Sequence, residues 1–139
     1  MPPYGFRALR KRHLTNKNMG LDQYAKTRDP KTGEVNEFGY WRKHNALHGW
    51  MENLWRSKGC PNKHEDAQDF NCVPLELTLE DLDLLEKDLL DSQLPETSGL
   101  FFGCSTASDD RYLLDDLGFV AEARRHLDNG LEVAYDSWW

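Results

Sequence analysis

The sequence predicts an α+β, mainly helical fold: a three-helix core with a short strand pair or extended edge near residues 100–104 and 131–138. Apolar residues recur at helical spacing in three separate stretches, and the last residues alternate as those of a strand do. Glycine, proline and small polar residues fill the stretches between them. At 139 residues the chain has the size of one domain, and we expect residues 38–139 to form it as a single compact unit.

Residues 1–37 keep neither the helical nor the strand period and are expected to form a basic, irregular N-terminal extension. Residues 1–35 contain eight Lys and Arg against three Asp and Glu, whereas residues 36–139 contain nine against twenty-one. Within the extension, Asp29–Gly33 has the composition of a turn. The acidic body argues against DNA or RNA as the main partner, because binding to phosphate backbones requires a clustered basic face.

The first helix is expected from about Tyr40 to Arg56, with Gly59 in the left-handed conformation that ends many helices. Apolar residues at intervals of three and four form its core stripe: Leu47, Trp50, Met51, Leu54 and Trp55. A second row carries side chains suited to hydrogen bonding or stacking, and we interpret it as more than a packing surface: Trp41, Arg42, Lys43, His44, Asn45, His48 and Glu52.

The second helix is expected to run to about Ser92, because Thr78 and Asp81 form a capping-box pattern ahead of a leucine stripe. The third is expected from about Asp109 to Asp128, with Ser108 as its cap and Asn129-Gly130 as its stop. Between these two helices, an apolar triplet flanked by glycines at residues 100–102 is either a short buried strand or a loop held by its phenylalanines. The alternating tail at residues 131–139 can pair with it.

Two groups of residues have metal-ligating side chains, but neither matches a standard site. His44, His48 and Glu52 lie along one side of the first helix without the base that a zinc hydrolase places after its first histidine. The spacing of the second group fits no zinc module: Cys60, His64 and Cys72. Cys104 lies in no catalytic signature. We therefore assign no catalytic residue, metal or cofactor.

The odd number of cysteines, with no signal peptide and no long apolar run, indicates a reduced cytoplasmic protein that does not enter a membrane. Anion or nucleotide binding is the best supported chemistry. Small hydroxylated residues near the third helix provide amide and hydroxyl donors: Thr97, Ser98, Gly99, Ser105 and Thr106. Arg42, Lys43, Asn45 and His48 add side-chain donors, and Tyr40, Trp41 or Trp138 add a ring for stacking. The alternative interpretation is a packed turn at residues 97–106 and a core position for Trp41.

Three stretches resemble a family of small bacteriophage and prophage proteins: Tyr40-Trp-Arg-Lys-His-Asn-Ala-Leu-His-Gly-Trp, Leu94-Pro-Glu-Thr-Ser-Gly-Leu-Phe-Phe-Gly-Cys-Ser-Thr, and Tyr135-Asp-Ser-Trp-Trp. The resemblance covers residues 38–139 and departs from the family pattern at Cys104 and at Ser137-Trp138. That family has no firm activity. The resemblance implies a phage-encoded protein acting in the host cytoplasm.

The leading hypothesis is a non-enzymatic protein that captures a small phosphorylated or nucleotide-like molecule and so sequesters a host immune signal. A homo-oligomer is compatible with this role, because a second subunit can complete a small ligand's enclosure. The first alternative is a protein-binding inhibitor of a host defence or nucleic-acid enzyme, in which the polar row is a hydrogen-bonded core network. The second is a small metal-dependent hydrolase that uses His44 and His48.

Overall fold

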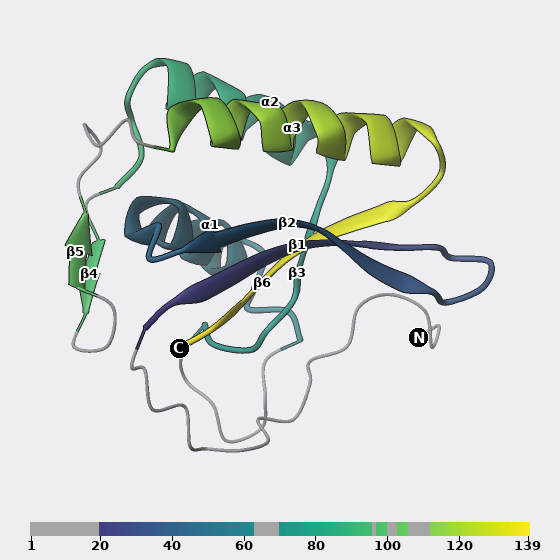
Figure 1. The fold of residues 1–139 in the computed structure, drawn as a ribbon, viewed down its shortest axis with the longest axis horizontal. Helices are drawn as coiled ribbons and strands as arrows, with labels where there is room; N and C mark the ends of the chain where they lie inside the picture. The colour runs from purple at the N-terminus through teal and green to yellow at the C-terminus, as the bar shows by residue number, and fades with distance from the viewer. Residues whose placement is uncertain (1–19, 63–69, 96, 100–102, 106–111) are drawn as a thin grey trace.

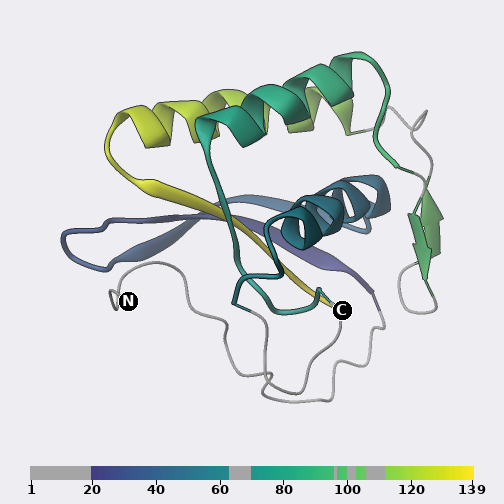
Figure 2. The same cartoon turned by 180° about the vertical axis from the view of Figure 1, so that it is seen from behind.

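The computed structural model describes residues 20–62, 70–95, 97–99, 103–105 and 112–139. Four strands form one antiparallel sheet in the order β2-β1-β6-β3, and two short strands pair in a separate hairpin. The elements are β1 (Asp22–Arg28), β2 (Val35–Arg42), α1 (Asn45–Ser57), β3 (Leu75–Leu77), α2 (Leu79–Leu90), β4 (Thr97–Gly99), β5 (Gly103–Ser105), α3 (Leu113–Asp128) and β6 (Glu132–Trp138). In Figures 1 and 2, α2 and α3 run side by side over the sheet, and α1 lies beneath them.

The expectation of a mainly helical core with a short strand pair is wrong, because the three helices pack on a four-stranded sheet. The strand expected at residues 131–138 is present as β6, but β6 pairs with β1 and β3. The 103–105 segment pairs instead with β4. Residues 20–37, expected in the irregular extension, contain β1 and the first residues of β2, so part of that extension is an inner strand of the sheet.

The strand register sorts the side chains of β1 between two faces, because opposed residues in antiparallel strands point the same way. Gln23, Ala25 and Thr27 are buried on the face that packs against the helices. On the other face, here called the open face, the strands carry a mixed set of charged and aromatic residues. This set comprises Asp22, Tyr24, Lys26, Glu37, Tyr40, Arg42, Glu132, Asp136 and Trp138.

The turn between β1 and β2 follows the composition of residues 29–33. Gly33 has a φ of +78°, and its amide donates to the Asp29 carbonyl at 2.7 Å. Beyond the turn, a β-bulge opposite Ala25 and Lys26 leaves Phe38 as an extra residue in β2. The Phe38 ring stacks on Phe119 of α3 at a centroid distance of 5.9 Å. The bulge therefore places an aromatic side chain between the edge strand and the third helix.

The first helix begins later than its sequence pattern predicts. Tyr40–Arg42 belong to β2, and the chain passes into α1 through Lys43, whose φ is +60°. From Asn45 to Met51 every residue of α1 is buried, so the polar row lies in the interior together with the apolar stripe. Gly59 has the expected positive φ, of +87°.

The ends of the other helices follow the local sequence signals. Gly130 takes a φ of +86° after α3, as its Asn-Gly pair predicts. Ser108, the expected cap of α3, lies outside the described residues. No helix in the described segments is long and apolar enough to cross a membrane.

The capping box of α2 is formed by reciprocal hydrogen bonds. The Asp81 amide donates to Thr78 Oγ1 at 3.2 Å, and the Thr78 amide donates to Asp81 Oδ2 at 2.9 Å. Thr78→Ala is expected to lower the free energy of unfolding by about 1 kcal/mol, because the Asp81 amide loses its acceptor. Urea denaturation measures this change. Thr78→Ser, which keeps the hydroxyl, is the control, and an equal loss in both variants would contradict the assignment.

Candidate functional site

The structure divides the candidate residues of the first motif into an exposed and a buried set. Tyr40 is 52% exposed, and Arg42 and Lys43 are also exposed. Trp41, Asn45 and His48 are 5%, 2% and 1% exposed, respectively. A ligand in solution can therefore meet the first set directly, whereas the second set lies within the protein.

The buried set is organised by the carboxamide of Gln23, which bonds both backbone groups of His44. The His44 amide donates to Gln23 Oε1 at 2.8 Å, and Gln23 Nε2 donates to the His44 carbonyl at 3.0 Å. Since a backbone amide can only donate, these bonds fix which end of the carboxamide is oxygen. Gln23 Nε2 also bonds the Tyr135 hydroxyl at 3.1 Å, and so joins β1, the start of α1 and β6.

The proton positions further along this network follow from the orientation of Gln23. Because Tyr135 accepts from Gln23, its hydroxyl proton is available to His48 Nδ1, which lies 2.8 Å away. His48 thus accepts at Nδ1 and carries its proton on Nε2. Burial lowers the pKa of His48 to about 4, which keeps the ring neutral. Burial also raises the pKa of Tyr135 well above its usual value, so the hydroxyl remains a donor.

A second part of the network joins β2, α3 and the residue before α1. Oδ1 of Asp116 accepts a hydrogen bond from Trp41 Nε1 at 2.9 Å. The other carboxylate oxygen, Oδ2, is 2.6 Å from His44 Nε2. Burial raises the pKa of Asp116, and the hydrogen bonds from His44 and Trp41 oppose that rise. The Tyr112 ring stacks on His44 with centroids 4.1 Å apart. Trp41 is therefore a core residue that positions Asp116.

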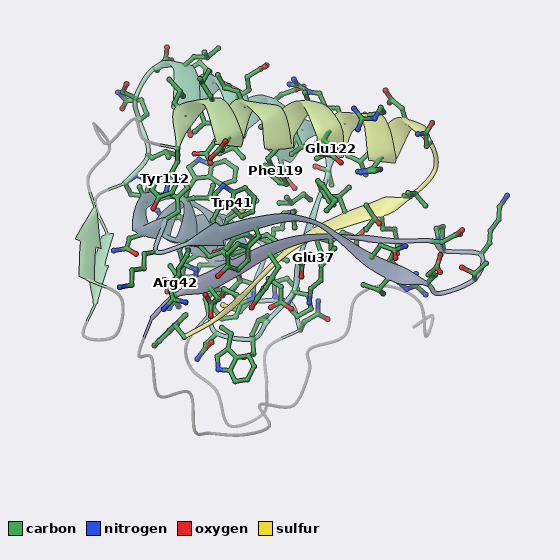
Figure 3. The ribbon with its side chains drawn as sticks, in the orientation of Figure 1. Glu37, Trp41, Arg42, Tyr112, Phe119 and Glu122 are labelled. Atoms are coloured by element: carbon green, nitrogen blue, oxygen red, sulfur yellow. The ribbon has the colours of Figure 1, made fainter. Side chains whose placement is uncertain are left out.

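The exposed cations Arg42 and Lys43 lie where β2 turns into α1, and Figure 3 labels Arg42 there. Residues 42–44 are here called the β2–α1 corner. A Cβ placed on Gly20 would lie 3.0 Å from Arg42 Nη2 and 3.5 Å from Lys43 Cε, so both side chains pass the same backbone position. The Tyr112 hydroxyl donates to the Arg42 carbonyl at 3.0 Å. The backbone of this corner is therefore held from α3, while its two cationic side chains face outward.

The open face next to the corner is rich in carboxylates. Asp22 accepts from Arg42 Nη1 at 3.3 Å and from the Tyr40 hydroxyl at 2.7 Å. Burial raises the pKa of Tyr24 to about 12, with contributions from Asp22, Tyr40, Glu37 and Asp136. Trp138, half-buried, lies across β1 from Arg42 because both residues pair with Asp22. Tyr40, Arg42 and Trp138 therefore share one face, although Asp22 separates the last two.

The hydroxyl-rich candidate segment forms the β4–β5 hairpin, which contacts α1. The backbone of Thr97, Ser98 and Gly99 pairs with residues 103–105, with Thr97 opposite Ser105. Thr106 lies outside the described residues. In Figure 1 the hairpin lies at the same end of the molecule as the connection from β2 to α1. The structure thus brings the two candidate motifs to one end of the fold.

His44, just before α1, and His48, within it, each bond a different side chain inside the protein. His44 Nε2 bonds Asp116 and His48 Nδ1 bonds Tyr135, while Glu52 bonds Arg56 one turn along the helix. Across the described segments, no three His, Cys, Asp or Glu side chains are grouped to hold a metal ion. Of the second metal candidate, Cys60 and Cys72 are half-buried thiols, and His64 lies outside the described residues.

Three residues of the network were not candidates from the sequence: Gln23, Asp116 and Tyr135. Gln23 and Asp116 lie in segments whose sequence carries no polar motif, and only the strand pairing and the helix packing bring them to His44. The sequence signal for Tyr135 was its place in the C-terminal motif, without an indication of its partner.

Comparison with protein-family models, curated proteins and solved structures finds no match to this chain. The functional argument therefore depends on the geometry of the site.

Replacing Gln23 tests its central position. Gln23→Met has a similar shape but leaves the amide of buried His44 without its acceptor and its carbonyl with the His48 amide alone, so we expect the free energy of unfolding to fall by about 2 kcal/mol. Chemical denaturation measures the loss. Gln93→Met, at an exposed carboxamide that bonds one backbone carbonyl, is the control and should change stability little. A similarly small loss in Gln23→Met would show that Gln23 does not hold the corner.

The lowered pKa of His48 predicts loss of stability in acid. In the unfolded chain His48 takes up a proton near its usual pKa of 6.5, whereas in the folded protein it stays neutral until pH is about 4. The stabilisation is present above pH 6.5 and is lost as pH falls to 4, by about 3 kcal/mol. His48→Asn keeps an acceptor for Tyr135 but cannot titrate. Unfolding free energies at pH 7 and pH 4 should fall less in this variant, and an equal fall would contradict the prediction.

Proposed function

We propose that this protein is a phage-encoded binding protein that captures a small phosphorylated or nucleotide-like molecule in the host cytoplasm without turning it over. The observation that supports it is the pair of exposed cations, Arg42 and Lys43, that pass Gly20 together. They precede α1, whose first turn contains no acidic residue. Guanidinium and ammonium groups at a helix start favour phosphate oxygens.

The buried residues of the motif have a supporting role in this proposal. Trp41 and His48 bond within the protein, so they hold the backbone on which the two cations are carried. Resemblance to the phage family favours the sequestration of a host immune signal as the biological purpose. Association into a homo-oligomer remains part of the proposal.

A second candidate function is a protein-binding inhibitor of a host defence or nucleic-acid enzyme. It is favoured by a different surface, on α2 and the first turn of α3. Leu84, Leu90 and Leu114 are 49%, 63% and 83% exposed there. The same helices carry many carboxylates, among them Glu80 and Asp83. Exposed apolar residues among acidic ones suit a basic, partly apolar partner.

Native mass spectrometry of protein purified from cells with an active defence signalling system tests the leading proposal. We expect a stoichiometric, non-covalent mass of nucleotide size on the wild-type protein. Arg42→Ala should lose it, because removing a charged phosphate contact weakens binding about tenfold or more. Arg125→Ala removes the same charge from an exposed position on α3 and should retain it.

The absence of a bound mass in the wild-type protein would contradict capture and favour the second candidate. Equal retention by Arg42→Ala and Arg125→Ala would contradict the assignment of the site to the β2–α1 corner. Arg42 is exposed, so its replacement should leave the melting temperature nearly unchanged.

A further inference from the structure

A buried nitrogen at the β2–α1 corner has no hydrogen-bond partner among the described residues. His44 is 2% exposed, and no residue in the described part of the chain bonds its buried Nδ1 atom. An unsatisfied polar atom in the interior is costly, and native structures contain few of them. The rest of the ring is tightly held, because Nε2 bonds Asp116 and one face stacks on Tyr112.

The bonding of Asp116 indicates which of the two His44 nitrogens carries the proton. Both Asp116 oxygens accept, one from Trp41 and the other from His44 Nε2, so the imidazole proton belongs on Nε2. The opposite tautomer would place an N–H at the unpartnered position, and an orphaned donor is the rarer arrangement. Nδ1 is therefore a lone-pair acceptor, held in a fixed direction.

We propose that His44 Nδ1 accepts a hydrogen bond from the captured molecule, and that the donor is a hydroxyl group of a ribose phosphate. This inference rests on the proposed function, since the phosphate is held by Arg42 and Lys43. Lys43 is the only residue between Arg42 and His44, and consecutive Cα atoms are about 3.8 Å apart. The two cations and the imidazole are thus carried by three consecutive residues.

The charges around the corner favour a molecule that extends toward α1 over one that extends across the open face. A molecule extending across the open face would meet the carboxylates that surround Tyr24, among them Asp22 and Asp136, and these repel phosphate. Toward α1 it meets the β4–β5 hairpin and the helix start. The half-buried Tyr112 covers one face of His44 and leaves the in-plane lone pair of Nδ1 uncovered by its stacking. His44 is in this view a binding residue, with Asp116 positioning it.

Two probes that differ only in the sugar hydroxyls test the inference. Adenosine 5′-monophosphate and 2′,3′-dideoxyadenosine 5′-monophosphate are titrated calorimetrically into the wild-type protein and into His44→Gln. Glutamine keeps an N–H for Asp116 but has no acceptor where Nδ1 lies. We expect the wild-type protein to prefer the ribose form about tenfold. His44→Gln should bind both forms equally, and inorganic phosphate as the wild-type protein does.

Tyr24→Leu is the matched control on the open face and should keep the preference for the ribose form. Loss of nucleotide binding in Tyr24→Leu would place the molecule over the open face and overturn the inference. The inference would also be overturned if His44→Gln kept the preference for the ribose form, or if the wild-type protein had no such preference. In either case, binding of inorganic phosphate would leave the proposed function standing. Binding of none of the three probes would overturn both.

A nitrogen-15 spectrum of the histidine rings gives a readout that does not require a variant. In the free wild-type protein the Nδ1 atom of His44 should have the shift of an unprotonated nitrogen. The ribose nucleotide should move that shift toward the hydrogen-bonded value, and the dideoxy nucleotide should not. A free protein with the proton on Nδ1 would overturn the inference.

Discussion

The fold depends on one buried carboxamide at the point where a strand becomes a helix. His44 has left β2 and has not yet entered α1, so its amide lacks the partner that regular structure supplies. Its carbonyl accepts the first hydrogen bond of the helix, from the His48 amide at 3.1 Å. Gln23, on the neighbouring strand, accepts from the His44 amide and gives the carbonyl a second donor. Its remaining N–H reaches Tyr135 on the third strand in the row. The sheet and the first helix are thus joined by one side chain.

The same device recurs at the last residue. Asn71 accepts from the Trp139 amide at 3.0 Å and donates to its carbonyl at 2.7 Å. Trp139 in turn lies against His48, with ring centroids 6.3 Å apart. At each end of the buried network, a carboxamide therefore bonds the amide and carbonyl of a residue that lies outside the regular strand pairing. With these backbone groups bonded, polar side chains can occupy part of the core.

Local signals were readable from the sequence, and long-range pairings were not. The Thr78 capping box and the glycines after α1 and α3 act within a few residues, and each formed as expected. Strand β1 was not predicted, because its buried residues are Gln23, Ala25 and Thr27. These do not give the alternation of apolar and polar residues that marks a strand in a sequence. His48 looked like a ligand residue because a sequence does not reveal whether a polar side chain finds its partner inside the protein. The exposure of Arg42 and Lys43 followed from their charge.

The order of strands also affects when the protein can fold. Lys26 of β1 bonds Asp136 of β6, 110 positions away, although the two strands are neighbours at the centre of the sheet. During synthesis β1 has only β2 to pair with, and its other edge stays open until the final strand leaves the ribosome. That open edge can recruit strands from other chains while translation continues. The sheet is completed only after residue 138 has emerged, so folding of this domain follows its synthesis.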